Sequence, residues 1–240
     1  MRSPSFPNPA LARPWPEGVP APNPWYRLMR RLFQVTMCAA WKVRVFDREH
    51  EPTRGGAVYI CNHQSFLDPM LMSFALRRPM NYMARESLFR LAGFRELIRS
   101  LNAFPVRRGT ADLTAMKEAM RRLRDGEQVV VFAEGTRTRD ARIGPLLPGV
   151  AVLSQRAAEW TVPVVIDGAF EAWPRTQALP GPGEIVVQYA PPIPRAEARR
   201  LRAKEFVRTV REQLVEIQTD LRRRVGRPPL DEARDKPLDD

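Results

Sequence analysis

The chain has 240 residues, enough for one substantial domain with a sizeable core. Its 44% hydrophobic and 28% charged residues are ordinary for a globular protein and exclude a fibrous or wholly disordered chain. The 39 Lys and Arg against 27 Asp and Glu give a net charge of +12, which favours polyanionic partners (nucleic acid, anionic lipid head groups or phosphorylated substrates) without choosing among them.

The N-terminal residues 1–24 are Pro-rich and lack the apolar core of a signal peptide, so we expect a mobile arm. The longest uncharged N-terminal run, residues 32–41, is shorter than the roughly 20 residues that a membrane-spanning helix needs. We therefore expect no transmembrane helix.

Residues 25–41 follow this arm, and apolar side chains recur there at helical spacing, with arginines between them. The pattern predicts an amphipathic helix. It fits a helix packed on the core of the domain, and it fits a helix lying on an anionic membrane surface with arginines on lipid phosphates. The two interpretations are compatible if the helix has one face for each.

Residues 42–225 alternate short β-like segments with helical ones, which predicts a single α/β domain with a mixed, mostly parallel sheet flanked by helices. The chain from residue 226 to 240 is polar and Pro-bearing, and we expect it to be disordered.

We expect strands over residues 42–47, 57–61, 81–84, 102–106, 128–132, 162–166 and 185–189. We expect helices over residues 69–76, within 86–101, from a cap at Thr110 to 123, and over 149–160 and 195–224. The last of these is highly charged on one side, which is typical of a docked helix with a solvated face and also fits a partner-binding helix.

Three predicted strands end in unusual polar groups, and in open α/β sheets sites collect at strand ends. The first strand end carries His63, followed five residues later by Asp68. A carboxylate that holds one ring nitrogen leaves the other free as a base. The second strand runs into Arg107 and Arg108, whose forked guanidinium groups suit a phosphate.

The third strand end carries Glu134-Gly135-Thr136-Arg137, in which the glycine lets a substrate approach the backbone closely. If the three ends converge, the simplest reaction is deprotonation of a hydroxyl on a phosphate-bearing acceptor, followed by attack on an electrophile.

The sequence lacks the motifs and residues that other catalytic mechanisms would need. The sequence has no G-x-S-x-G elbow and no Walker A loop. Cys38 and Cys61 both lie in apolar surroundings, typical of a reducing compartment, and the position of Cys61 on a buried strand argues against a nucleophile. His50 falls in a polar loop, and with two histidines and no clustered Cys we expect no metal site.

Four blocks, in order, resemble those of the glycerolipid acyltransferases of the 1-acyl-sn-glycerol-3-phosphate O-acyltransferase type. They are Asn62-His63-Gln64-Ser65-Phe66-Leu67-Asp68, similar to N-H-x-S-x-x-D; Phe104-Pro105-Val106-Arg107-Arg108-Gly109; Phe132-Ala133-Glu134-Gly135-Thr136-Arg137, similar to F-P-E-G-T-R; and Val162-Pro163-Val164-Val165-Ile166.

The resemblance implies roles for these residues. His63 would be the general base on the acceptor hydroxyl, with Asp68 as its partner. The hydroxyl would attack the thioester of acyl-CoA or acyl-carrier protein directly, with no acyl-enzyme intermediate and no bound cofactor. The acceptor would be a lysophospholipid, most simply 1-acyl-sn-glycerol-3-phosphate, and the product phosphatidic acid. Five residues of the second and third blocks would bind its glycerol phosphate: Arg108, Glu134, Gly135, Thr136 and Arg137. Three other residues of the blocks would have lesser roles: Asn62, Ser65 and Arg107.

The resemblance also implies a monotopic or peripheral enzyme on the cytoplasmic face of the cell membrane, seated by the helix over residues 25–41. It makes residues 42–225 the acyltransferase domain.

Two departures from the family pattern bear on the acceptor. Ala133 replaces the usual proline, and Leu147-Pro148 stand where many members have the lysine of an F-K-x-G block. The acceptor can therefore differ from 1-acyl-sn-glycerol-3-phosphate. Two other possibilities are a basic nucleic-acid-binding protein, for which the sequence has no recognition motif, and a catalytically silent homologue, against which the intact His63–Asp68 pair argues.

Overall fold

The computed structural model describes residues 22–107 and 112–230 of the chain. The predicted mobile arm therefore lies outside the described residues up to position 21, as do Arg108 and the predicted helix cap Thr110. The first helix, α1 (Pro24–Ala40), begins where the sequence predicts it, because Pro24 occupies the first turn and the side chain of Asn23 accepts a hydrogen bond of 2.7 Å from the Tyr26 amide.

The described residues form one eight-stranded sheet whose main path has the order β1-β7-β6-β2-β5-β3-β4, with the short β8 paired to β6. Strand β6 runs antiparallel to β7 and β8, and the other pairs are parallel. The predicted mixed, mostly parallel α/β sheet is therefore confirmed. The strands are β1 (Lys42–Phe46), β2 (Ala57–Cys61), β3 (Met80–Arg85), β4 (Ala103–Val106), β5 (Gln128–Phe132), β6 (Trp160–Asp167), β7 (Glu184–Tyr189) and β8 (Ile193–Pro194).

The remaining elements are helices that connect or cover these strands. They are the 3₁₀ turns η1 (Arg48–His50) and η2 (Glu86–Phe89), and the helices α2 (Asp68–Met72), α3 (Ala92–Ser100), α4 (Leu113–Arg124), α5 (Gly149–Arg156), α6 (Ala169–Ala172), α7 (Arg195–Ala198) and α8 (Ala203–Arg224).

Three predicted helices are shorter or broken in the structure. Helix α2 ends at Met72, and the Gln34 amide donates to the Phe74 carbonyl at 2.6 Å. The predicted helix over residues 195–224 breaks into α7 and α8, where Gln155 donates to two carbonyls between them. Helix α5 stops at Arg156, and the amides of Glu159 and Trp160 donate to the Gly56 carbonyl where β6 begins.

The cap of α4 also differs from the prediction. The side chain of Asp112 accepts hydrogen bonds from the Thr114 and Ala115 amides at 3.1 and 3.0 Å, so this carboxylate caps the helix. Asp112 stands at the cap position, two residues after the predicted cap Thr110, which places a negative charge at the positive end of the helix dipole.

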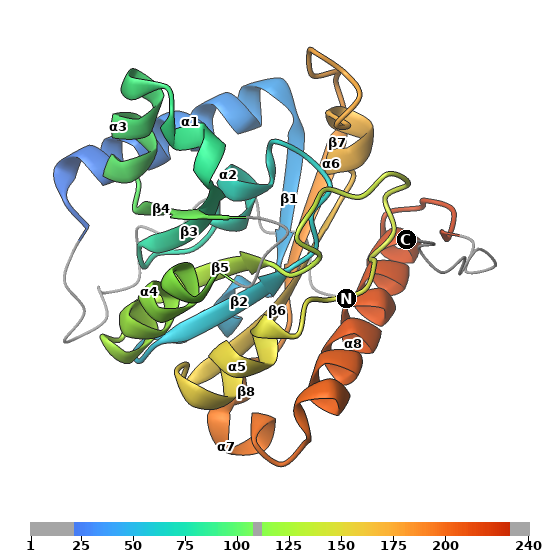
Figure 1. Ribbon diagram of the computed structural model, residues 1–240. Helices are drawn as coiled ribbons and strands as arrows, with labels where there is room; N and C mark the ends of the chain where they lie inside the picture. Colours follow the sequence, from blue (N-terminus) through green and yellow to red (C-terminus); the bar gives the residue numbers. More distant parts are fainter. Residues whose placement is uncertain (1–21, 108–111, 231–240) are drawn as a thin grey trace.

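The sheet is the middle layer of three, as Figure 1 shows. Alternate residues of β2 point to opposite faces, so Tyr59 packs in the cluster with α1, α2 and α6. Val58 and Ile60 pack in the clusters with α4, α5, α7 and α8 on the other face. Because both faces are covered, all five residues of β2 are buried, as expected for a central parallel strand.

The packed domain extends beyond the predicted boundary at residue 226. Asp167, fully buried at the end of β6, binds Arg222 at 2.9 Å and Arg227 at 2.5 Å. A buried carboxylate needs such partners, so the chain is held to the domain at least as far as Arg227. The predicted tail from 231 to 240 lies outside the described residues.

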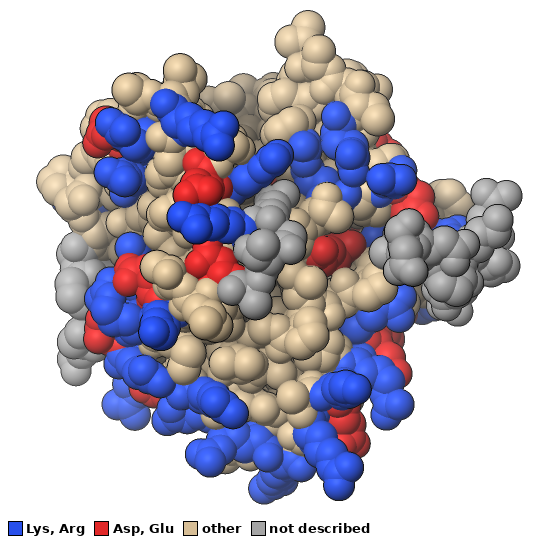
Figure 2. Space-filling view, in the orientation of Figure 1, with Lys and Arg blue, Asp and Glu red and all other residues tan. Residues whose placement is uncertain are grey.

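Lys and Arg side chains form a basic band along one edge of the molecule, besides others spread over the visible face (Figure 2). Figure 2 shows Lys and Arg side chains along the lower edge, over α7 and the start of α8. Helix α7 adjoins the beginning of β6, since the Arg195 amide donates to the Glu159 carbonyl at 2.9 Å. His63 follows the end of β2, which runs parallel to β6, so this basic surface and His63 lie at opposite edges of the sheet.

Candidate active site

The loop between β2 and α2 carries the paired imidazole and carboxylate. The Nδ1 atom of His63 lies 2.6 Å from Oδ2 of Asp68, which is fully buried. The same oxygen accepts hydrogen bonds from the amides of Gln64 and Ser65 at 2.6 and 2.7 Å. Because a carboxylate only accepts hydrogen bonds, Nδ1 carries the proton and Nε2 is left as the basic nitrogen.

A stacking contact on one face of the imidazole also restrains the His63 side chain. Its ring stacks on the ring of Phe132 at the end of β5, with centroids 4.3 Å apart and planes 22° from parallel. His63 is nearly buried and lines a pocket. A base held at one nitrogen and one face is arranged to receive a proton from a bound hydroxyl.

The side chains of Asn62 and Ser65 bond to backbone groups of other segments and so hold the loop between β2 and α2 in place. The Asn62 side chain exchanges two hydrogen bonds of 2.8 Å with the backbone of Ile166 in β6, extending the ladder between the strands. The Ser65 hydroxyl donates to the Trp173 carbonyl at 2.8 Å. Ser65 also lines the pocket.

Glu134 follows β5, the neighbour of β2, so two of the three predicted strand ends converge. Its carboxylate accepts hydrogen bonds from the His63 amide at 2.9 Å and from the Gly144 amide at 3.0 Å. Burial raises the pKa of Glu134 to about 7, while these two amides act in the opposite direction. In this arrangement the carboxylate ties the loop that carries His63 to the segment around Gly144, and it does not line the pocket.

The other residues of the third block, Gly135, Thr136 and Arg137, differ in whether they line the pocket. Gly135 has φ of +71°, which favours glycine, and a Cβ there would lie 2.9 Å from Cδ1 of Leu147. Thr136 is exposed, and neither Gly135 nor Thr136 lines the pocket. Arg137 does line it, and its guanidinium carbon lies 3.5 Å from the ring centroid of Phe66.

The second predicted strand end, which carries Arg107, does not join this cluster. Arg107 follows β4, which is separated from β5 by β3, and its exposed guanidinium lies 3.3 Å from Glu86. Arg107 does not line the pocket. Arg108 belongs to the segment outside the described residues, so its predicted role stays a prediction.

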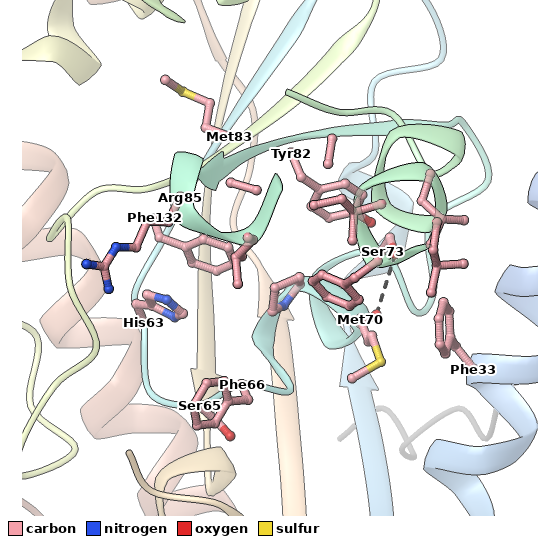
Figure 3. A pocket seen from close by; sticks show the side chains of 18 of the residues that line it. Phe33, His63, Ser65, Phe66, Met70, Ser73, Tyr82, Met83, Arg85 and Phe132 are labelled. Carbon is pink, nitrogen blue, oxygen red and sulfur yellow. Dashed lines mark hydrogen bonds between the residues drawn. The ribbon is translucent and has the colours of Figure 1, made fainter. Parts of the chain in front are cut away.

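The pocket itself is the feature that the sequence did not reveal. It has a volume of about 510 Å³ and is lined mainly by apolar side chains from α1, α2, β3, η2 and α3. Figure 3 shows His63, Phe132 and Arg85 at one end and Phe33 of α1 at the other. Arg85, the last residue of β3, is a polar group at a strand end, so the rule that singled out His63 applied to it also.

The described residues contain no group of three or more His, Cys, Asp or Glu side chains arranged to hold a metal ion. Cys61 lies beside the catalytic loop but is fully buried. Burial raises the pKa of this thiol well above its ordinary value, and the carboxylates of Asp68 and Glu134 raise it further. A thiol held in its neutral form is a poor nucleophile.

Comparison with known proteins places this site in a family. A family model described as "Acyltransferase" matches residues 42–167, which is more than half of the chain. The chain belongs to this acyltransferase family. The resemblance predicted from the four sequence blocks is therefore confirmed, and the protein is an O-acyltransferase.

Individual relatives of this acyltransferase span bacteria and plants. A 1-acyl-sn-glycerol-3-phosphate acyltransferase of Bacillus subtilis (strain 168) is 25% identical over 190 residues, covering 79% of this chain and 92% of that protein. One of Limnanthes douglasii is 29% identical over 161 residues, covering 63% of this chain and 54% of that protein, so the chain spans about half the length of that plant relative.

A solved structure shares the fold. The crystal structure of the 1-acyl-sn-glycerophosphate (LPA) acyltransferase, PlsC, from Thermotoga maritima superposes with a TM-score of 0.72 at 21% identity. The match covers 82% of this chain and 79% of that one. It supports the sheet order and helix layers described above.

Proposed function

We propose that the protein transfers an acyl chain from a thioester, acyl-CoA or acyl-carrier protein, to the free hydroxyl of 1-acyl-sn-glycerol-3-phosphate, giving phosphatidic acid. The observation that carries the proposal is the His63–Asp68 pair at the end of a long apolar pocket. The names of the bacterial and plant relatives supply the acceptor.

His63 acts as the general base. The acceptor oxygen attacks the thioester carbonyl carbon while its proton passes to Nε2 of His63. The tetrahedral intermediate collapses, the carbon–sulfur bond breaks, and the thiolate takes the proton back from His63. Asp68 accepts the hydrogen bond from Nδ1 throughout and stabilises the imidazolium that forms between the two steps.

The pocket binds an acyl chain. Its volume of about 510 Å³ lies within the roughly 300–1,000 Å³ of pockets that bury most of a small ligand, and its lining is mainly apolar. Burying each methylene in an apolar wall contributes about 0.8 kcal/mol, so a long chain supplies substantial binding energy. The reactive carbonyl then lies at the His63 end of the pocket.

Arg137 binds the phosphate of the acceptor. It is the guanidinium of the third block that lines the pocket near His63, and a guanidinium fork matches phosphate oxygens. Arg85 is a second cation at the same end (Figure 3). Gly135 allows the backbone of this block to turn in a conformation that other residues rarely adopt.

A different lyso-lipid is the second candidate acceptor, and one observation favours it. Leu147, at the position of the family lysine, is half exposed and lies against Gly135. An apolar side chain there offers nothing to a phosphate oxygen, so a lipid with a different head group would fit this flank.

The protein works at the cytoplasmic face of the membrane. Within the described ranges, no helix is long and apolar enough to cross a bilayer. One side of α1 lines the pocket with Tyr26 and Phe33. Large apolar side chains are exposed on α1 and on the nearby η2 and α3: Leu28, Leu32 and Val35, then Leu88, Leu91 and Phe94. Such a surface, with arginines beside it, suits an interfacial helix on anionic lipid.

The test is product analysis with a panel of acceptors. Purified protein is given palmitoyl-CoA and, in separate reactions, 1-acyl-sn-glycerol-3-phosphate, lysophosphatidylethanolamine, lysophosphatidylglycerol and monoacylglycerol. We expect phosphatidic acid, detected by mass spectrometry, to form fastest. Faster acylation of another lyso-lipid would replace the acceptor in this proposal, and no acylation of any would defeat it.

A further inference from the structure

The segment after β6 contacts three consecutive residues of the catalytic loop. The amide of Phe170 donates to the Gln64 side chain at 3.3 Å, and the Ser65 hydroxyl donates to the Trp173 carbonyl at 2.8 Å. The rings of Phe66 and Trp173 lie with centroids 5.2 Å apart and planes tilted by 47°. Residues 170–173 are thus docked onto the loop between His63 and Asp68.

Phe66 also meets the cation of the third block. The guanidinium carbon of Arg137 lies 3.5 Å from the centroid of the Phe66 ring, well within the range of a cation–π contact. Phe66 is 49% exposed, which is unusual for a phenylalanine beside a buried catalytic pair. Phe66 therefore contacts Trp173 in a tilted aromatic pair and Arg137 in a cation–π contact (together, the stack), and Phe66 and Arg137 line the pocket together with His63.

We propose that Phe66 and Trp173 are positioning residues that hold the Arg137 guanidinium where the phosphate of the acceptor binds. The stack uses the face of the guanidinium. Phosphate oxygens are bound by its edge, through N–H groups in the plane of the fork. The aromatic contact and the phosphate contact can therefore be made together.

The stack limits the conformations of a long, flexible side chain. An arginine has about 2 kcal/mol of rotamer entropy to lose when it binds a ligand. Because the Phe66 ring already restrains Arg137, less of this cost falls on acceptor binding. Phe66 belongs to the same short loop as His63, so the loop that places the base also places the phosphate-binding cation at a fixed separation from it.

This inference rests on the proposed function, since it needs an acceptor with an anionic group. It differs from a purely structural role for Phe66 and Trp173 in what it predicts for kinetics. Loss of loop packing would lower kcat or stability for every substrate. Loss of the Arg137 orientation raises KM for the phosphate-bearing acceptor and leaves KM for the acyl donor unchanged.

The experiment compares Phe66→Leu, Phe66→Tyr and Trp173→Leu with the wild-type enzyme, using palmitoyl-CoA with 1-acyl-sn-glycerol-3-phosphate or with monoacylglycerol, which lacks the phosphate. For Phe66→Leu we expect KM for the phosphate acceptor to rise roughly five-fold, the size of a cation–π contact of about 1 kcal/mol at a partly exposed site. KM for the donor and kcat with monoacylglycerol should stay within about two-fold. Phe66→Tyr keeps the aromatic face and should retain the low KM, and Trp173→Leu should show a smaller rise.

A double-mutant cycle completes the test. If Phe66 acts through Arg137, Phe66→Leu should add little to the KM increase already caused by Arg137→Ala. Additive increases, or equal effects on both acceptors, would overturn the inference and leave the proposed function standing. Failure of the wild-type enzyme to acylate 1-acyl-sn-glycerol-3-phosphate would defeat both the proposed function and this inference. The wild-type activity is therefore measured before any variant is compared.

Discussion

The loop after β2 and the wall of the apolar pocket are held in place very differently. Asn62, Gln64 and Ser65 are buried, and their side chains are hydrogen-bonded to three other segments. The far wall includes α3, which has no buried residue, and Leu91 just before it is 70% exposed. The proposed base therefore stands on a buried, hydrogen-bonded loop, whereas the proposed acyl-chain wall is built from exposed apolar elements with few fixed contacts.

The difference follows from what each region has to do. A general base must be placed within a fraction of an ångström of the proton that it accepts, which requires fixed hydrogen bonds. An acyl chain is bound through contact area, and many side chains of similar size can supply it. The predictions below test each side of this contrast.

After the loss of the base itself, the largest effect is expected at the carboxylate that orients it. Asp68→Asn removes an acceptor that holds three donors and lets the imidazole adopt the wrong tautomer, so kcat should fall roughly 10³-fold or more. Steady-state kinetics with matched circular dichroism spectra check this. The same substitution at the exposed Asp125 should leave kcat within about two-fold, and an equal loss in both variants would contradict the assigned role.

A large loss of stability is expected where the loop is bonded to β6. Asn62→Ala leaves the backbone amide and carbonyl of Ile166 buried without their partners, which should lower the free energy of unfolding by about 3 kcal/mol. Urea denaturation measures it. A loss below about 0.5 kcal/mol would show that the loop is less rigidly held than its hydrogen bonds indicate.

A smaller effect concerns pH. The pKa of Glu134 is raised from 4.5 to about 7 in the folded protein. Between these values the folded state binds a proton that the unfolded state has lost, so stability falls as pH rises from about 4.5 to 7. The contribution should be about 2–3 kcal/mol.

The matched control for this slope is Glu134→Gln, which cannot titrate. The difference in unfolding free energy between wild type and variant, measured by denaturation at several pH values, should favour the wild type most at low pH. A difference that is constant with pH, or that grows in the opposite direction, would contradict the buried, proton-binding state of Glu134.

The smallest effect is expected at the far end of the pocket. Phe33→Trp adds volume opposite His63 (Figure 3), so the longest acyl chains should lose roughly ten-fold in kcat/KM relative to shorter ones. Competition between palmitoyl-CoA and lauroyl-CoA gives this ratio directly. Val35→Trp, on the exposed side of the same helix, should leave the ratio unchanged, so an equal shift there would count against the pocket as the acyl site.

Prediction from sequence succeeded where the determinants are local. The strand before His63, the helix after Pro24 and the pairing of His63 with Asp68 follow from patterns of fewer than twenty residues. The four blocks predicted the family, which the family match confirmed. The convergence of His63 and Glu134 required only that β2 and β5 be neighbours in a parallel sheet.

The missed features depend on contacts between distant segments. The pocket brings α1 to η2 and α3, about sixty residues apart, and no pattern in either segment shows that pairing. The breaks in the predicted helices depend on side chains such as Gln34 and Gln155 reaching carbonyls elsewhere in the chain. The two backbone amides that donate to the Glu134 carboxylate come from segments 71 and 10 residues away, which the sequence does not pair, and the predicted role of Glu134 in acceptor binding stays a prediction.

The central claim is that His63 is the base that activates the acceptor hydroxyl, and His63→Ala tests it most directly. The rate of phosphatidic acid formation from palmitoyl-CoA and 1-acyl-sn-glycerol-3-phosphate is measured for wild type and variant, with thermal unfolding as the control for folding. The described part of the site has no second group placed to take the proton, so the rate should fall by more than the roughly 10²- to 10⁴-fold usual for loss of a general base. A folded His63→Ala variant that keeps a tenth or more of the wild-type rate would contradict the account.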